Sequence, residues 1–268
     1  MLLRRLIWLA LLAAVLVGTA HWLLVQWQAV PIIFAAEAME DRKVSATPNV
    51  PSGHALGLQH GSAAGGNSHG HEAWKPADGF ERSAWTWVAS VLLQFGLALG
   101  LLVAIAFSSQ RQSAAAAPMR TSLILAAAGF FCLFAWPALG LPPEIPGMDA
   151  ARLGSRQVWW ALGAGCAGSA VASAVLLRAS WRWALAVALL AVPFVVGAPH
   201  IASDPFASFD ASTATQLRQL ADRFVWVTVG TSLIQWILLG LTCGVLAQRW
   251  LLPVIVDPRG APVPAWGS

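Results

Sequence analysis

Histidine is concentrated in one polar segment of the chain, residues 35–83. Four of the six histidines lie there, namely His54, His60, His69 and His71. His69, His71 and the adjacent Glu72 together offer two imidazole nitrogens and one carboxylate. Neutral imidazole is a common ligand of Zn²⁺, Cu²⁺, Ni²⁺ and Co²⁺, so the segment could capture a divalent metal ion. No set of four ligands at a fixed spacing is visible, and histidines scattered in a polar loop can also serve only its solubility.

Further candidate ligands lie at the ends of apolar stretches. Glu37 and Glu40 are one helical turn apart, so on a helix they would share a face and attract cations, or simply form a solvated helix end. Three more candidates follow apolar stretches: Glu144, Met148 and His200. His21 lies inside an apolar stretch, where it could contact a metal ion or only hydrogen-bond a neighbouring helix.

The elements that must position these residues are indicated by the absence of charge. Six apolar stretches contain no Asp, Glu, Lys or Arg: 6–34, 84–107, 121–138, 158–177, 183–199 and 224–247. About 20 apolar residues cross the hydrocarbon core of a bilayer, and a charge at its centre costs roughly 2.5–3.5 kcal/mol. The sequence therefore predicts an all-α, polytopic integral membrane bundle of about six transmembrane helices. The stretch 183–199 is short and contains Pro193, so five spans are also possible.

Composition excludes several other classes of protein. Apolar residues make up 57% of the chain and charged residues 10%, against about 25% charged in an ordinary soluble domain. The basic residues form no contiguous patch, so no nucleic-acid partner is expected despite the net charge of +4. Nucleotide-binding, zinc-protease and serine-hydrolase motifs are missing, so we expect neither ATP hydrolysis nor another enzyme activity.

Basic residues also predict an orientation. Lys and Arg are denser in 1–5, 108–120, 178–182 and 248–268 than in the other connecting segments, which places both termini in the cytoplasm. The chain is then a single membrane domain over residues 1–268, with a short cytoplasmic tail at 248–268. Residues 35–83, rich in Gly, Ser and Pro, form a flexible extracytoplasmic loop. The first apolar stretch resembles a signal peptide but is too long for one, so we expect it to be retained.

Small residues predict where helices pack together. Gly96-x-x-x-Gly100 and Gly240-x-x-x-Gly244 each place two glycines on one helix face, which lets another backbone approach closely. Cys132, Cys166 and Cys243 are isolated in apolar surroundings and should pack as small hydrophobic side chains.

Several ordered motifs resemble those of the CbtA family of proposed bacterial cobalt transporter subunits. They are Pro31 with Ala36-Glu37 and Glu40, then 71–79 (HEAWKPADG) with Glu81-Arg82, 138–148 (ALGLPPEIPGM), Arg156-Gln157, Trp159-Trp160 and Gly197-Ala198-Pro199. The resemblance implies a polytopic inner-membrane subunit that takes part in cobalt uptake. It also implies a small companion subunit with one membrane span and a His-containing end.

These observations lead to one hypothesis, a permease subunit for Co²⁺, with Ni²⁺ or Zn²⁺ as other possible ions and no tightly bound cofactor. The ion would be gathered by the loop residues His69, His71, Glu72, His54 and His60. Its approach would be lined by Glu37, Glu40, Glu144, Met148 and His200, with His21 as the first contact inside the membrane. The alternative is a metal-binding membrane sensor or scaffold that conducts nothing.

Overall fold

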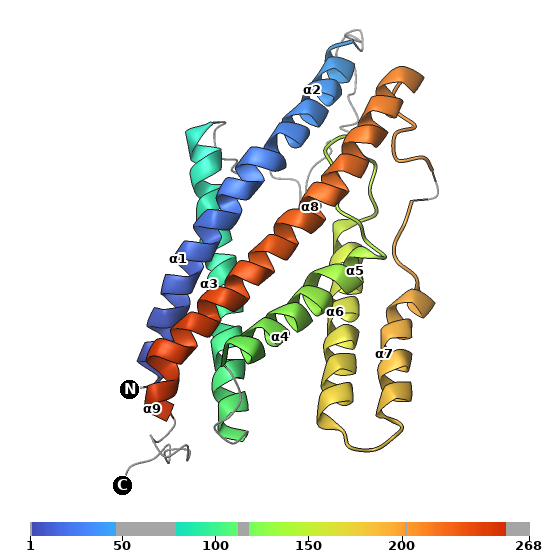
Figure 1. The fold of residues 1–268 in the computed structure, drawn as a ribbon. Helices are drawn as coiled ribbons and strands as arrows, with labels where there is room; N and C mark the ends of the chain where they lie inside the picture. The colour runs from blue at the N-terminus through green and yellow to red at the C-terminus, as the bar shows by residue number, and fades with distance from the viewer. Residues whose placement is uncertain (1, 47–78, 112–117, 202, 256–268) are drawn as a thin grey trace, which may run out of the picture. The chain divides into compact units, whose positions relative to one another are not determined.

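The computed structural model describes residues 2–46, 79–111, 118–201 and 203–255, and within these ranges it contains helices and loops but no strand. The predicted all-α class is confirmed. The helices, in chain order, are α1 (Leu2–Gln28), α2 (Val30–Ala46), α3 (Phe80–Arg111), α4 (Pro118–Phe130), α5 (Trp136–Ala138), α6 (Leu153–Leu176), α7 (Arg182–Val196), α8 (Ala211–Leu246) and α9 (Leu252–Ile255) (Figure 1). Two π-helical turns join them, η1 (Phe131–Ala135) and η2 (Ala247–Leu251).

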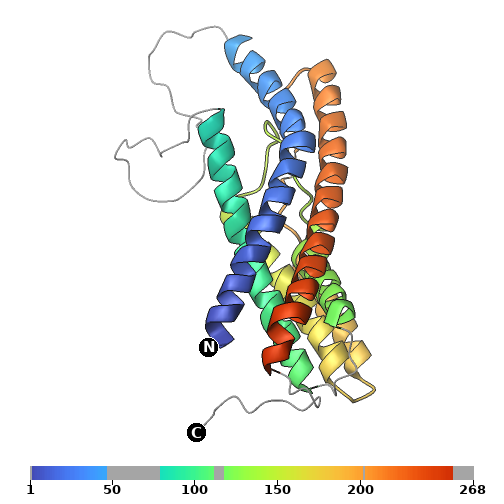
Figure 2. The ribbon, with the colours of Figure 1, turned by 60° about the vertical axis from the view of Figure 1, so that its left-hand side comes forward.

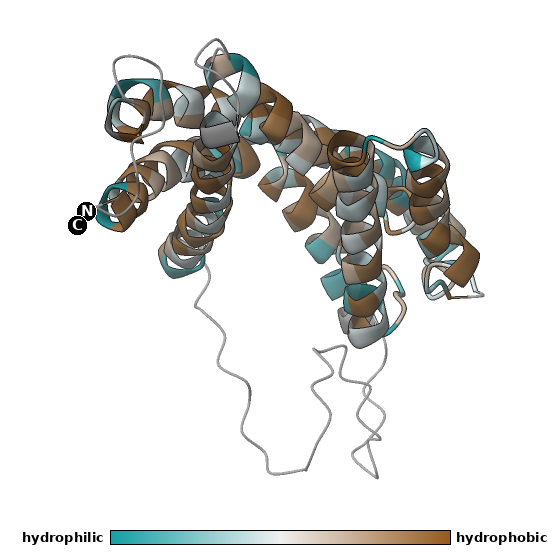
Figure 3. Ribbon diagram, turned by 90° about the horizontal axis from the view of Figure 1, so that it is seen from below, coloured by the Kyte–Doolittle hydropathy of each residue, from teal (hydrophilic) through white to brown (hydrophobic). Residues whose placement is uncertain are grey.

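Five helical runs in the described part of the chain are long and apolar enough to cross a membrane. They are Leu2–Gln28, Phe80–Ser109, Pro118–Ala138, Leu153–Leu176 and Ala211–Leu251. In Figure 3, brown apolar residues are spread along the helices together with pale residues of intermediate hydropathy, and strongly hydrophilic residues are few. This is the pattern of side chains that face lipid, so the protein is a multi-pass membrane protein.

The sixth stretch predicted from the sequence forms only the short helix α7. This helix has 15 residues, or about 22 Å at 1.5 Å per residue, against about 30 Å of hydrocarbon. It ends at Gly197, whose φ of 84° lies in the left-handed region that favours glycine. The preferred count of six spans is therefore corrected to five candidate spans among the described residues, the alternative that Pro193 suggested. The orientation with both termini inside stays a prediction.

The described residues fall into two compact units. The first comprises Met1–Trp27, Lys75–Phe134 and Val229–Ser268, and the second comprises Gln28–Trp74 and Ala135–Thr228. The long helix α8 contributes its N-terminal half to the second unit and its C-terminal half to the first. Each unit has its own apolar core. The single membrane domain expected over the whole chain stays a prediction.

In the first unit, α1 and α3 pack antiparallel at close range (Figure 2). A Cβ on Gly18 would lie 2.9 Å from the Cα of Val91, so only glycine lets the two backbones come this near. The indole of Trp87 donates a hydrogen bond to Thr19 Oγ1 at 3.0 Å, and Gln26 donates another to Ser83. These contacts set the register of α1 against α3.

Among the described residues of the first unit, one of the two glycine motifs packs against a neighbouring helix and the other does not. Gly240 and Gly244 pack against α4, where an added Cβ would come within 2.9 Å of Ala126 and 2.8 Å of the Met119 sulfur. The packing prediction for this pair is confirmed. Around Gly96 and Gly100, no described atom lies within 4 Å of an added Cβ, so the prediction for that pair is wrong. Cys243, on the same helix as Gly240, is fully buried as expected.

The helical run that begins with α8 extends further than the sequence predicts. Residues 248–255, assigned from the sequence to the tail, belong to η2 and α9. Leu251 and Ile255 are buried in the core of the first unit. The rest of the predicted tail lies outside the described residues.

In the second unit, α6 and α7 form an antiparallel hairpin anchored by Trp159 (Figure 1). The buried indole of Trp159 donates a hydrogen bond to the carbonyl oxygen of Pro193 at 3.0 Å and packs edge-on against Phe194. Trp136 of α5 packs edge-on against Phe194 as well, with ring centroids 5.2 Å apart. A Cβ on Gly140 would lie 2.1 Å from the Trp159 ring, so the chain leaves α5 directly over this side chain. The aromatic cluster therefore determines where the next segment, 141–149, begins.

Candidate functional site

The proline-rich segment 141–149 packs into the core of the second unit. Its Ile145 is only 4% exposed and lies in one cluster with Ile32 and Ala36 of α2 and Leu217 of α8. Prolines lack the N–H that a helix requires, so this segment crosses the core as an irregular chain. The site candidates Glu144 and Met148 flank this buried anchor.

A tight turn positions Met148. The N–H of Met148 donates a hydrogen bond to the carbonyl of Ile145 at 3.4 Å, and Gly147 between them has φ of 81°. Proline followed by glycine at the two central positions is the pattern of a type II turn. Met148 is thereby folded back against the cluster, against which Met39 of α2 also packs.

Glu37 and Glu40 both lie on α2, because the helix continues past Pro31 to Ala46. The Cβ of Glu40 lies 4.0 Å from the position that a Cβ on Gly147 would occupy. The second unit therefore brings the carboxylate-bearing side of α2 next to the turn that carries Met148. Glu37, one helical turn earlier, already has an interaction partner.

Glu144 is engaged in an ion pair. Its Oε2 lies 2.8 Å from the guanidinium of Arg156, and both side chains are about one-quarter exposed. A partly desolvated pair of this kind ties the segment to the start of α6, since separating the charges leaves each without its partner. A metal ion would have to compete with Arg156 for this carboxylate.

The segment 204–210 packs against the same cluster through Phe206 and Phe209. The N–H of Asp149 donates a hydrogen bond to the carbonyl of Pro205 at 3.0 Å, and Asp204 forms an ion pair with Arg218 of α8. Asp210 caps α8: the Ser212 hydroxyl and the N–H groups of Ser212 and Thr213 donate to its carboxylate. The Ser212 hydroxyl bond, followed by the bonds from Thr213, holds the pKa of Asp210 well below its ordinary value.

A pocket of about 440 Å³ lies beside this cap, between α2 and the start of α8. Its walls include Met39, Arg42 and Lys43 of α2 and the ring of Phe209. The ammonium of Lys43 lies 4.5 Å from the centre of that ring. Met39 is not among the ligands predicted from the sequence, although its spacing from Ile32 and Ala36 is that of one helix face.

Two described candidates remain, His200 and His21. His200 is exposed on the irregular stretch that follows α7 in the second unit. His21 belongs to α1 in the first unit, where its Nδ1 is buried without a hydrogen-bond partner among the described residues. The second unit thus places Glu40 beside the turn that carries Met148, and Met39 against the same cluster as Met148, while no described contact joins His200 to them.

Within the described ranges, no group of three or more His, Cys, Asp or Glu side chains could hold a metal ion. The expected capture residues His54, His60, His69, His71 and Glu72 lie outside those ranges. Metal capture by the loop and the roles assigned to the approach residues stay predictions.

Comparison with known proteins assigns the family. No curated protein and no solved structure matches the chain. One family model does match, over residues 3–248, and its description is CbtA, probable cobalt transporter subunit. The match includes almost all of α1, the proline-rich segment and all of α8, so that it extends over parts of both compact units. The chain therefore belongs to the CbtA family of probable cobalt transporter subunits.

Proposed function

We propose that this chain is the membrane subunit through which Co²⁺ is taken up into the cell, without ATP hydrolysis by the chain itself. The observation that carries the proposal is the family match over residues 3–248 of a chain whose described part supplies five apolar helices. A membrane subunit of a cobalt transporter needs a way to gather the ion outside and a path for it into the bilayer.

The His-bearing loop would perform the gathering. An imidazole side chain binds a metal ion only in its neutral form. The loop offers two histidines close to Glu72 and two more upstream. Residues 35–46 of the expected flexible loop belong instead to α2, which carries Glu37 and Glu40, and the loop histidines follow α2 in the sequence. An ion released from the loop would therefore meet these carboxylates next.

The approach would run along the contact between α2 and the turn at Gly147. Glu40 lies beside this turn, and Met39 and Met148 pack in the same cluster. Carboxylates attract a divalent cation, while thioethers bind it only weakly, so the ion could be drawn in without being trapped. In this scheme the main role of Glu144 is to hold the segment 141–149 in place through its ion pair with Arg156. His200 would contact the ion before it reaches the turn, and His21 would be its first contact inside the membrane.

The membrane potential is sufficient to drive such uptake. Each positive charge that moves into a compartment 100 mV more negative gains about 2.3 kcal/mol, so a divalent ion gains about 4.6 kcal/mol. At 1.4 kcal/mol per tenfold change, this supports accumulation of roughly a thousandfold. The chain requires no nucleotide for this, although a companion subunit with its own metal-binding end could raise the rate of delivery.

The test is uptake of radioactive Co²⁺ into vesicles that contain the purified chain, with and without its companion, under an imposed inside-negative potential. We expect flux that grows with the potential and falls in the Glu37→Gln/Glu40→Gln double variant. The matched control is Asp222→Asn, which removes an exposed carboxylate on α8. Competition by Ni²⁺ and Zn²⁺ would show the order in which the chain prefers the three ions. Metal binding without flux in both preparations would contradict the permease and favour the sensor or scaffold.

A further inference from the structure

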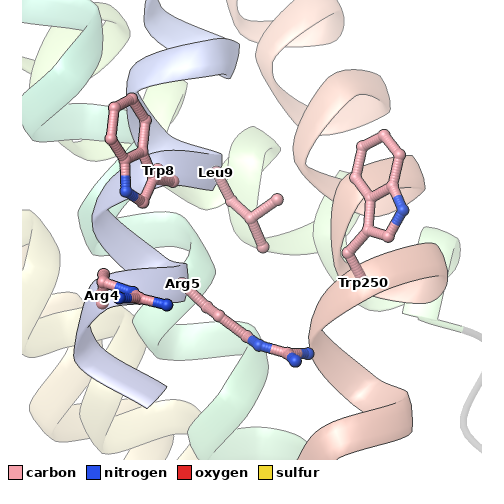
Figure 4. Close-up of a pocket in the computed structure, with 5 residues that line it drawn as sticks. All are labelled: Arg4, Arg5, Trp8, Leu9 and Trp250. Atoms are coloured by element: carbon pink, nitrogen blue, oxygen red, sulfur yellow. The ribbon is translucent and has the colours of Figure 1, made fainter. Parts of the chain in front are cut away.

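A groove in the first unit lies between the first turns of α1 and the π-helical turn η2. It has a volume of about 650 Å³ and is lined by Arg4, Arg5, Trp8 and Leu9 of α1 and by Trp250 of η2. Figure 4 shows Arg5 reaching from α1 toward η2, with Trp8 and Trp250 on the two sides of the groove. It is distinct from the α2 site, which belongs to the second unit.

Among the described residues, the charge of the groove is positive and uncompensated. No acidic side chain of this part of the chain lines it, and α1 contains no Asp or Glu between Leu2 and Gln28. Neither Arg4 nor Arg5 forms an ion pair with any residue in the described part of the chain. A guanidinium presents a planar fork of N–H donors that matches two oxygens of a phosphate group. The groove is therefore suited to an anion with phosphate chemistry.

The walls of the groove distinguish a lipid from a free anion. Trp8 is 64% exposed and Trp250 is 49% exposed, while Leu9 is buried between them. A small phosphate ion would leave both indole rings uncovered. A phospholipid would bring acyl chains that cover the rings while its phosphate meets the arginines, and tryptophan is enriched at this depth of a bilayer because its ring is amphipathic.

The depth of the groove fits the level of lipid headgroups. The charge-free stretch begins at Leu6, immediately after Arg4 and Arg5, so the two guanidinium groups lie at the end of an apolar span. On the other side, Trp250 lies within a single π-helical turn, a deviation often found at functional sites in helices. Leu6 and Leu9 share one buried cluster with Ala247 and Leu251, which holds the two walls of the groove together.

We propose that this groove is a binding site for one anionic phospholipid, with the phosphate held by Arg4 and Arg5 and the acyl chains covering Trp8 and Trp250. The lipid joins the start of α1 to the end of α8, two helix ends that are far apart in the sequence. It acts as a structural ligand of the first unit.

The test is native mass spectrometry of the full chain in detergent, titrated with phosphatidylglycerol and, separately, with phosphatidylcholine. We expect one phosphatidylglycerol to bind more tightly than phosphatidylcholine. In Arg4→Gln/Arg5→Gln its dissociation constant should rise about 30-fold, or ~2 kcal/mol at 1.4 kcal/mol per decade for two arginines. The control, Arg120→Gln/Arg178→Gln, removes two exposed arginines at other helix ends and should leave the constant unchanged.

A second variant guards against misfolding or altered insertion. Arg4→Lys/Arg5→Lys keeps both charges and loses only the planar forks, so it should weaken phosphatidylglycerol binding several-fold and keep the preference over phosphatidylcholine. The proposal is overturned if the glutamine variant binds like the wild type or if the control weakens binding equally. It is also overturned if millimolar inorganic phosphate displaces the lipid, or if a second copy of the chain rather than lipid occupies the groove.

Discussion

Replacing Gly240 by alanine should weaken the packing of α8 against α4. The new Cβ would lie 2.9 Å from the Cβ of Ala126 and 3.2 Å from a methyl carbon of Leu123. Non-bonded carbon atoms rest at about 3.5–4.0 Å, so the helices would have to part by roughly 0.5–1 Å. The Cβ of Ala126 cannot rotate away from the new methyl group, because its position is set by the backbone.

The expected change in stability combines three contributions. Overpacking of this kind costs about 1–3 kcal/mol. Parting the helices also stretches the hydrogen bond that Ser122 Oγ donates to the Gly240 carbonyl, now 2.6 Å long, and such bonds between membrane helices contribute about 0.6 kcal/mol on average. The stronger helix preference of alanine returns up to about 1 kcal/mol. We therefore expect Gly240→Ala to reduce the free energy of unfolding by roughly 1–2 kcal/mol.

Gly96→Ala is the matched control for this prediction. It makes the same chemical change in another helix of the same unit, at a site where no described atom lies within 4 Å of the added Cβ. Unfolding of the purified variants in one detergent, followed by the loss of helical circular dichroism, should rank Gly240→Ala below wild type and Gly96→Ala level with it or above it. Equal stability of Gly240→Ala and wild type, or equal losses in both variants, would refute the packing argument.

Four further outcomes are expected. Gln94→Leu should raise the free energy of unfolding by about 1–3 kcal/mol in the same assay, because the amide of Gln94 is fully buried with no partner among the described residues; a loss of stability would contradict this. A double-mutant cycle of Glu144→Gln and Arg156→Gln should give a coupling energy of about 1 kcal/mol, and zero coupling would mean that the ion pair does not hold the segment. Because hydrogen bonds lower the pKa of Asp210, its capping of α8 should be complete above the unfolded pKa of about 3.9 and be lost as the pH falls further through the folded value. Amide hydrogen exchange at Ser212 and Thr213 should then speed up relative to its intrinsic rate, with no such step in Asp210→Ala. Co²⁺ binding to the intact chain, measured by calorimetry, should weaken as the pH drops through about 6.5 because protonated imidazole is no ligand, and a pH-independent affinity would contradict capture by the loop.

The sequence predicts the class of the protein well because the membrane imposes a simple rule. Charges are excluded from the hydrocarbon core, so the stretches that are both apolar and free of charge mark the helices directly. The same rule does not report helix length, and α7 stops at Gly197 because of a backbone conformation rather than a charge. Nor does it tell a packed glycine from an uncovered one. Gly96 and Gly240 belong to identical motifs, and only their neighbours in space separate them.

The candidate site is predicted less completely than the fold. Glu40 and Met148 are recognisable as potential ligands, but they are separated by more than 100 residues, and no spacing rule indicates that the turn at Gly147 rests beside Glu40. Several charged residues lie close to Glu144 in the sequence, so the sequence alone does not identify Arg156 as its partner. The signal for Met39 is its spacing, which places it on the same helix face as Ile32 and Ala36.

The bond between Trp159 and the carbonyl of Pro193 limits how the α6–α7 hairpin can move. That carbonyl also accepts the N–H of Gly197 at 3.0 Å, so one oxygen ties down both the helix end and the neighbouring helix. If α7 slid along α6 by even one residue, the indole N–H of Trp159 would lose its acceptor in a place where water is scarce. A buried N–H without a hydrogen-bond partner costs several kcal/mol of free energy. Any rearrangement of α6 and α7 should therefore move the hairpin as one body, through changes in the irregular segments on either side of it.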